Sequence, residues 1–450
     1  MGVMIVGAGV AGLTLGHELV RAGQEVTVVE ILPEIGGLAR SFRYGDFVFD
    51  LGPHRFHTEN AEVESFIRAI LGANQADIRR SSGVWFFDRY HDWPLKPSSL
   101  LKIPKREMLK ACLDLFFRPR PRSESFEDYV LARYGRTIYR LFFKPYTEKF
   151  IKYRCDQLHH SWAKAGINRA VIEKRLEVSG IWNLVRGTLF PQKVDTRFIY
   201  PRRGGIGAFT DALGEGIRRG GGTLLTDCRL TALRREGSRV VAAVDSRGAV
   251  HEVDHLFWTG TLPALEELLE LPDFRLEYLA SLFLNFEVDG EPDHEYQWIY
   301  YGGPDLVFSR ASFPTRFSPL TAPPGKHGIC VEIACMEGDG AWNHPEWVIG
   351  DVRTQMIRVG LVPRYTAIED CHVEKVRHTY PIYTLGYQER KAEAARQIGQ
   401  QARNISLLGR TGNFWYNNMD HSIAQALHMA RKFLACAEDL SVSTEEIFQG

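Results

Sequence analysis

The sequence has few of the features that define several common protein classes. Its seven cysteines are scattered, odd in number and free of any C-x-x-C pair, which predicts reduced thiols and no metal site. No uncharged run approaches the roughly 20 residues that span a bilayer. Lysine plus arginine equals aspartate plus glutamate at 55 each, so the charge balance does not indicate a nucleic acid partner. No internal repeat or low-complexity region is present.

The start of the chain also lacks a basic segment followed by a cleavable apolar run. We therefore expect no signal peptide and a soluble, cytoplasmic protein without a transmembrane segment. The chain has 450 residues, which is long enough for two or three domains around a large core.

What the sequence does contain is a glycine-rich turn near its start. An apolar run at 3–6 leads into Gly7-Ala8-Gly9-Val10-Ala11-Gly12, a helical pattern follows, and a second apolar run ends in Glu30. This is the βαβ fingerprint of a dinucleotide site. Gly7 permits the tight turn, Gly9 lets the backbone approach a pyrophosphate, and Gly12 lets helix and strand pack closely. Glu30 is placed to accept hydrogen bonds from ribose hydroxyls.

A second glycine turn selects among dinucleotides. Gly36-Gly37 is followed by Arg40, and the apolar run 47–51 leads into Gly52-Pro53-His54. A nicotinamide dehydrogenase has no need of a glycine-arginine turn here, whereas an FAD protein uses one to hold its longer cofactor. The pattern resembles the flavin amine oxidase and protoporphyrinogen oxidase superfamily. This resemblance implies tightly bound FAD.

The rest of the chain predicts an α/β protein built around this site. We expect a Rossmann-type FAD-binding domain of the glutathione reductase kind, assembled from residues 1–75, 196–270 and 391–450. The first of these segments is expected to contain a helix at 61–71. A helical and basic region is expected at 76–195, with a helix at 125–143 and a helical continuation to residue 169. Aromatic-rich strands between 271 and 390, at 282–288, 296–301, 306–313 and 328–335, predict an inserted antiparallel substrate domain.

The stretch from 96 to 122 has two interpretations. Its cations are interleaved with apolar residues: Lys102, Lys105, Arg106, Lys110, Arg118, Arg120 and Arg122 with Leu113, Leu115, Phe116 and Phe117. Such a surface attracts an anionic ligand or an anionic membrane. The alternative is a solvated helix face with an exposed basic loop.

Two segments resemble UDP-galactopyranose mutase. The histidine loop at 52–58 is the more specific, and the segment 409–420 resembles the C-terminal flavin motif of that family. The resemblance implies FAD contacts from Gly7, Gly9, Gly12, Glu30, Gly37, Arg40, Gly52, Pro53, His54, Leu230, Gly409, Arg410, Asn418, Met419 and Asp420.

The resemblance also implies an unusual reaction. In this family N5 of reduced FAD attacks the anomeric carbon of a nucleotide-linked pyranose, and the sugar recloses as the furanose without net redox change. NADPH or NADH then serves as a possible reductant. His54 would lie against the flavin, and Tyr380 and Tyr416 beside the substrate diphosphate. By residue type and location, Arg310 or Arg202 is a candidate to bind that diphosphate.

The sequence departs from the mutase pattern at several positions, which leaves the substrate open. Ile151 stands where the family has tryptophan, Lys96 replaces an asparagine, Asn418 replaces an aspartate, and residues 277–281 lack an expected arginine. One alternative is therefore an FAD-dependent oxidase or dehydrogenase acting on a hydrophobic substrate. Another is a flavin-bound scaffold without catalysis. His57 could make a structural hydrogen bond, Tyr380 and Tyr416 could be packing aromatics, and Arg310 could pair with an acid. Oligomeric state is not predicted.

Overall fold

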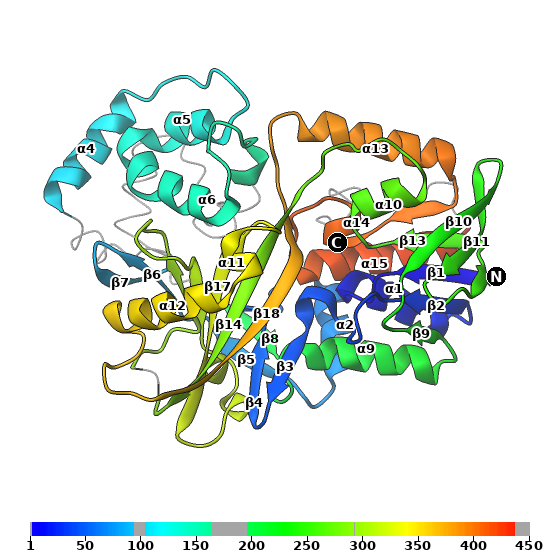
Figure 1. Ribbon diagram of the computed structural model, residues 1–450, viewed down its shortest axis with the longest axis horizontal. Helices are drawn as coiled ribbons and strands as arrows, with labels where there is room; N and C mark the ends of the chain where they lie inside the picture. The colour runs from blue at the N-terminus through cyan, green and yellow to red at the C-terminus, as the bar shows by residue number, and fades with distance from the viewer. Residues whose placement is uncertain (1, 94–103, 164–195, 292, 437–450) are drawn as a thin grey trace.

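The computed structural model describes residues 2–93, 104–163, 196–291 and 293–436. It contains a nucleotide-binding half built on a parallel sheet, a second half built on a long antiparallel sheet, and a helical region beside the latter (Figure 1). No described helix is both long and apolar enough to span a membrane. All seven cysteines are free.

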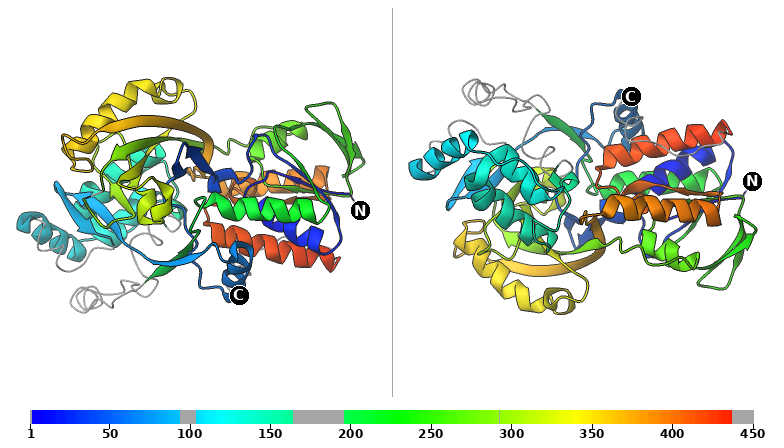
Figure 2. Two further views of the ribbon diagram at one scale, coloured as in Figure 1. Left: turned by 90° about the horizontal axis from the view of Figure 1, so that it is seen from below. Right: turned by 90° about the horizontal axis from the view of Figure 1, so that it is seen from above.

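The parallel sheet has five strands in the order β19-β13-β1-β2-β9. Its strands are β1 (Gly2–Val6), β2 (Glu25–Val29), β9 (Thr223–Leu225), β13 (His255–Trp258) and β19 (Ile405–Leu407). Three helices lie side by side along one face (Figure 2): α1 (Val10–Arg21), α9 (Gly207–Arg219) and α15 (Met419–Leu434). The other face carries the meander β10 (Leu230–Glu236), β11 (Arg239–Asp245) and β12 (Val250–Glu252).

The alternation of side chains along β1 explains this layering. Val3 and Ile5 pack into one apolar cluster with the helices, whereas Met4 packs into the cluster that contains the meander. A strand buried on both faces reads as a continuous apolar run, as the sequence does here. The predicted Rossmann-type α/β fold class is confirmed.

The second sheet has seven strands in the order β18-β14-β17-β16-β15-β6-β7. They are β6 (Ser82–Phe86), β7 (Arg89–Asp92), β14 (Tyr278–Asp289), β15 (Trp298–Tyr301), β16 (Arg310–Ser312), β17 (Lys326–Cys335) and β18 (Ile368–Pro381). Neighbours are antiparallel except for β15 and β6, which run parallel. Helix α12 (Glu346–Arg358) packs on one face through Val352 and Met356. The sheet thus draws two strands from the segment expected to be helical and basic.

The opposite face of this sheet packs on the nucleotide-binding half. The hairpin β3 (Ser41–Tyr44) and β4 (Phe47–Asp50) meets it through Phe49, which shares an apolar cluster with Phe283 and Cys330. Further elements are β5 (Ala76–Arg79) paired with β8 (Arg197–Tyr200), α2 (Ala61–Leu71), α10 (Leu262–Leu268), α11 (Gly340–Asn343), α13 (Tyr387–Gln401) and α14 (Gly409–Gly412), with 3-10 turns at Gly37–Ala39, Pro314–Arg316 and Pro319–Thr321.

The helical region contains α4 (Lys105–Phe116), α5 (Phe126–Ile138), a π-turn (Tyr139–Phe143) and α6 (Lys144–Ile151). Ser125 caps α5 by accepting from the Asp128 N–H at 3.1 Å, as its sequence signature indicates. The expected helical continuation to residue 169 is confirmed by α6 and by the helical residues 161–163, but it is wrong for 152–160. Lys152 has a φ of 63° and ends α6, and turns follow. Residues 164–169 lie outside the described part.

Candidate active site

The two glycine turns predicted from the sequence lie against each other. Gly7 has a φ of 99°, and a Cβ there would lie 2.1 Å from Thr259 Oγ1. A Cβ on Gly37 would lie 3.0 Å from the Cα of Gly9, and Gly9 also pairs with Gly36 in an isolated bridge. Gly12 has the oxygen of Gly7 at 2.1 Å from its Cβ position. Only glycine fits this backbone cradle, as a pyrophosphate site requires.

Glu30 and Arg40 supply the charges at this cradle. The Glu30 carboxylate is buried and accepts from the Ala8 N–H at 2.7 Å and the Leu32 N–H at 3.0 Å. Arg40 is buried and donates from Nε to the Gly37 carbonyl at 2.9 Å. Its Nη1 lies 3.7 Å from Glu34. Both side chains are therefore held by the glycine turns themselves.

The last third of the chain meets the same cradle. Gly409 has a φ of 77°, and its Cβ position lies 3.0 Å from Ala11 of α1. Its N–H donates to Gln425 of α15 at 2.9 Å. Asn418 caps α15 in a capping box with His421, which places Met419 and Asp420 in the first helical turn. These residues are brought together with the first βαβ unit, as predicted.

The histidine loop follows β4 and is anchored by Asp50. The Asp50 carboxylate accepts from Ser41 Oγ at 2.6 Å, Tyr200 Oη at 2.6 Å and the Ile206 N–H at 3.0 Å. Burial raises the pKa of Asp50 to about 6, against the opposing effect of these hydrogen bonds. The loop therefore leaves β4 from a fixed point.

His54 lies in a strongly cationic environment. Burial first, and then the charges of Arg410, Arg310 and Arg55, lower its pKa to about 3. Its Nδ1 is buried without a hydrogen-bond partner in the described part of the chain. At neutral pH His54 is therefore an uncharged imidazole with one ring nitrogen available to a ligand.

Arg310 lies on β16, opposite Glu332 of β17. Its Nε donates to Glu332 Oε2 at 2.7 Å, and Nη2 contacts the same oxygen. Nη2 also reaches the Tyr380 hydroxyl at 3.4 Å. Gly52 has a φ of 79°, and a Cβ there would lie 3.3 Å from Nη2, so glycine is favoured where the histidine loop passes this ion pair. Of the two interpretations of Arg310 from the sequence, pairing with an acid is therefore seen in the structure.

Arg410 lies over the two predicted substrate tyrosines. Its guanidinium carbon is 5.1 Å from the centre of the Tyr380 ring and 5.5 Å from that of Tyr416. Its nitrogens donate to the Thr379 carbonyl at 3.0 Å and the Asn417 carbonyl at 2.5 Å. The two rings meet edge to face at 5.1 Å. Arg410 thus holds both tyrosines through their faces.

Further aromatic rings pack against this group. Phe150 meets Tyr380 at 5.2 Å, and Trp162 stacks on Tyr416 at 5.0 Å. Tyr146 lies 5.9 Å from Phe150. The site therefore combines flat apolar surfaces with hydroxyl groups and guanidinium groups, a combination suited to a polar ring or a nucleobase.

The residues fit FAD. The two glycine turns provide the close approach that a pyrophosphate needs, and Glu30 directly follows β2, where a ribose contact is expected. The free Nδ1 of His54 is an orphaned buried polar atom on the loop expected to lie against the flavin. Leu230 is buried at the start of β10 and shares a cluster with Met4 and Val29 of the parallel sheet.

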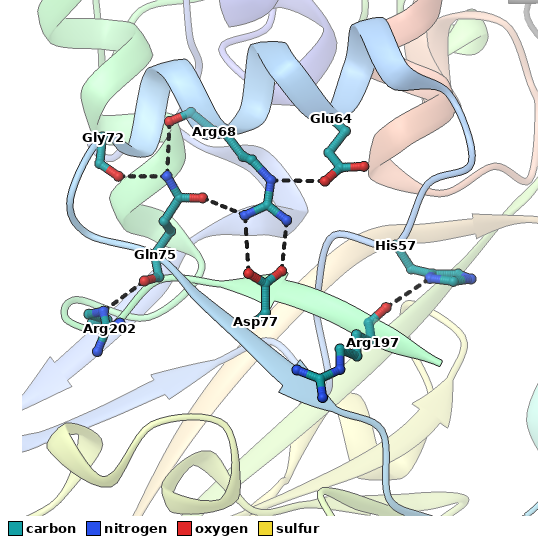
Figure 3. Close-up of polar contacts among 8 residues, drawn as sticks. All are labelled: His57, Glu64, Arg68, Gly72, Gln75, Asp77, Arg197 and Arg202. Atoms are coloured by element: carbon teal, nitrogen blue, oxygen red, sulfur yellow. Dashed lines mark hydrogen bonds and ion pairs between the residues drawn. The ribbon is translucent and has the colours of Figure 1, made fainter. Parts of the chain in front are cut away.

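Two residues named in the sequence analysis lie elsewhere. Figure 3 shows Arg202 donating to the Gln75 carbonyl, at 2.7 Å from Nε, on an exposed edge of the fold. The same view shows His57 Nδ1 at 3.2 Å from the Arg197 carbonyl, the structural hydrogen bond considered from the sequence.

Lys149 donates from Nζ to the carbonyls of Tyr301, Gly303 and Phe308 at 2.5, 2.8 and 2.9 Å, which ties α6 to the loop after β15.

Sequence reasoning missed Asp50, Arg55, Arg80, Trp298 and Glu332. Glu332 carried a signal, because it is a lone charge within the apolar strand pattern of 328–335. A group of possible metal ligands was also missed: ligand atoms of Glu124, His159 and His160 lie within 4.8 Å of one another.

A cleft of about 530 Å³ lies beside Arg40, Thr210 and Thr226.

A family model described as flavin containing amine oxidoreductase matches residues 10–386. The chain is 25% identical over 421 residues to a phytoene dehydrogenase of Streptomyces griseus, covering 77% of this chain and 75% of that protein. It is 36% identical over 85 residues to an L-amino acid oxidase of Crotalus durissus cumanensis, a match that spans 19% of this chain and 17% of the oxidase.

Solved structures share the fold. Reduced UDP-galactopyranose mutase superposes with a TM-score of 0.84 at 20% identity, covering 99% of this chain and 97% of that one. A putative protoporphyrinogen oxidase from Exiguobacterium sp. 255-15 has a TM-score of 0.73 at 16% identity, covering 96% and 98%. The expected superfamily and its mutase-like architecture are confirmed. The chain belongs to the flavin-containing amine oxidoreductase family and is an FAD-dependent enzyme.

Proposed function

We propose that the protein interconverts the pyranose and furanose forms of a nucleotide-linked sugar, without net redox change. The observation that carries this proposal is the concentration of positive charge around a neutral histidine: Arg55, Arg310 and Arg410 all act on His54. Such a site favours an anionic substrate.

In this proposal the chain's residues position the substrate. Arg310 and the hydroxyls of Tyr380 and Tyr416 bind the diphosphate, as donors to an oxyanion. The glycine turns, Glu30 and Arg40 would hold FAD, which in its reduced form would supply the nucleophile for the anomeric carbon. His54 accepts or donates one hydrogen bond without adding charge, since its imidazole is neutral at physiological pH. The aromatic rings of Phe150 and Trp162 exclude water from one side.

A second candidate is an FAD-dependent oxidase or dehydrogenase acting on a hydrophobic substrate. It is favoured by the family match and by the match to the phytoene dehydrogenase. The aromatic lining also suits it. An amine substrate is less suitable, because a protonated amine is repelled by the arginines and the buried Glu332 is already paired with Arg310.

An anaerobic assay separates the two functions. The holoprotein is reduced with dithionite, incubated with a panel of nucleotide sugars, and the products are resolved by anion-exchange chromatography. Furanose formed by reduced enzyme alone, with the flavin still reduced afterwards, supports the mutase. No conversion, together with bleaching of the oxidised flavin by polyenes, porphyrinogens or amines, supports the oxidoreductase.

We also propose that α4 rests on an anionic membrane surface. Four apolar side chains on and just after it are exposed: Leu109, Leu113, Phe116 and Phe117. Both acids of α4 are occupied, since Glu107 pairs with Lys110 and Arg140 and Asp114 accepts from the Thr137 N–H. The remaining cations around the apolar group match the charge of anionic lipid headgroups.

A further inference from the structure

Two arginines outside the predicted site share one tryptophan. The guanidinium carbon of Arg55 lies 4.2 Å from the centre of the Trp298 ring, and that of Arg80 lies 5.4 Å from it. Trp298 is fully buried on β15, so its ring is a fixed platform for both cations. Arg55 follows His54 directly, which joins this platform to the histidine loop.

The two arginines make few other contacts. Arg55 donates to the Pro53 carbonyl at 3.3 Å, and Arg80 donates from Nε to Ser82 Oγ at 3.2 Å. No ion pair to a carboxylate is found for either within the described residues. Each guanidinium has five N–H donors, so most of them are left over. Burial first, and then the charges of Arg80 and Arg310, lower the pKa of Arg55 to about 10, while Tyr300 and the more distant Asp420 carboxylate oppose this shift without forming an ion pair.

Like charges held together in a partly desolvated site are costly unless an anion joins them. The tryptophan face offsets part of that cost, but it cannot satisfy the donors at the edges of the guanidinium groups. A bidentate oxyanion satisfies both edges and both charges at once.

The register of the sheet places this pair beside the proposed diphosphate site. Tyr300 of β15 is opposite Arg310 of β16, and Trp298 is two residues earlier on the same strand. Two residues of strand correspond to about 7 Å. The Arg55 and Arg80 pair is therefore next to Arg310 along the sheet but is built on a separate platform.

We propose that Arg55 and Arg80, on Trp298, form a second oxyanion subsite of the substrate pocket. Resting on the function proposed above, this subsite binds a carboxylate on the sugar while Arg310 binds the diphosphate, so the substrate is a nucleotide-linked sugar acid. The same guanidinium chemistry would also bind the diphosphate itself, and the experiment distinguishes the two sources.

The test measures binding to the oxidised holoenzyme by isothermal titration, independently of turnover. The probes are inorganic pyrophosphate, UDP-galactose and UDP-galacturonate, and the variants are Arg55→Met and Arg80→Met. Arg89→Met is the control, because Arg89 is exposed on β7 of the same sheet. We expect each variant to lower the affinity for UDP-galacturonate by about tenfold and to leave the affinities for UDP-galactose and pyrophosphate unchanged. Arg55→Lys should restore part of the affinity.

An equal loss of affinity for all three probes would support an oxyanion subsite that binds the diphosphate, and would overturn the proposal that the substrate is a sugar acid. Absence of binding to the wild-type protein, or binding that neither variant changes, would overturn the subsite. The midpoint potential of the flavin is measured in parallel. A shifted potential with unchanged probe affinity would show that the arginines act on the flavin, which also overturns it. Furanose formation by the reduced wild-type protein in the anaerobic assay reports on the mutase separately, and a variant that binds and converts UDP-galacturonate as wild type does contradicts the subsite alone.

Discussion

Arg310 and Glu332 form a buried ion pair across β16 and β17, at the point where the histidine loop crosses the sheet. The Glu332 side chain is only 1% exposed, and its Oε1 has no hydrogen-bond partner in the described residues. The pair therefore depends on Arg310 alone to compensate a desolvated carboxylate.

Arg310→Met should destabilise the holoprotein by about 3–5 kcal/mol, because it leaves Glu332 charged and buried without a partner. Urea unfolding followed by circular dichroism measures the change. Lys326→Met is the control, since it breaks the partly exposed pair with Glu369 and should cost about 1 kcal/mol or less. Equal losses in the two variants would contradict the structural role of the Arg310 pair.

Gly52→Ala tests the close approach of the histidine loop to Arg310. Gly52 has a φ of 79° and the guanidinium 3.3 Å from its Cβ position, whereas Gly45 has a φ of 53° and nothing within 4 Å. Gly45→Ala should cost about 1 kcal/mol of backbone strain alone. Gly52→Ala should cost more and should also lower the FAD content measured by absorbance. If the Gly52→Ala protein has the FAD content of wild type and the same free energy of unfolding as Gly45→Ala, the close approach of the loop to Arg310 has no energetic consequence and the prediction is wrong.

His54 should make stability depend on pH. Its pKa falls from 6.5 in the unfolded chain to about 3 in the folded protein, so the unfolded chain binds more protons between these values. The stabilising contribution is complete above pH 6.5 and is lost as the pH falls towards 3, at up to about 1.4 kcal/mol per pH unit. Urea unfolding of wild type and His54→Asn across this range measures it. The curve for His54→Asn should be flatter, and the exposed-site variant His344→Asn should follow wild type.

The exposed face of α4 predicts binding to anionic vesicles. Phe116 and Phe117 are 68% and 82% exposed, and replacing both with serine removes the largest apolar contacts. Sedimentation with phosphatidylserine-containing vesicles should capture wild type but not the double variant, and phosphatidylcholine vesicles should capture little of either. Tyr365→Ser is the control, because Tyr365 is 94% exposed away from α4. Dimerisation through this face, seen by light scattering without vesicle binding, would contradict the membrane role.

The sequence predicted the parts of the fold that depend on local patterns. Gly7 and Gly12 have no room for a side chain, and Gly9 lies against Gly37, so the spacing of the three glycines was sufficient to place the dinucleotide cradle. The capping of α5 by Ser125 was predictable for the same reason. The end of α6 was not, because Lys152 adopts a left-handed conformation for which its residue type gives no signal.

The candidate site was predictable only in part. His54, Tyr380 and Tyr416 lie in motifs, and the structure brings them together around Arg410. The Arg55 and Arg80 pair depends on Trp298, which is placed by the pairing of β15 with β6 across more than 200 residues of sequence. Register at such a separation is a tertiary property that no local pattern carries.

The order of the strands also determines when the site can form during synthesis. β1 is made well before its neighbour β13, which ends at Trp258, and the sheet is completed by β19 at Leu407. In the seven-stranded sheet, β6 likewise gains its inner neighbour only after β15 has been made. Pairings this distant are slow to form and leave strand edges open on the growing chain. The flavin cradle is therefore completed only after α15 has left the ribosome, so cofactor capture follows the synthesis of both sheets.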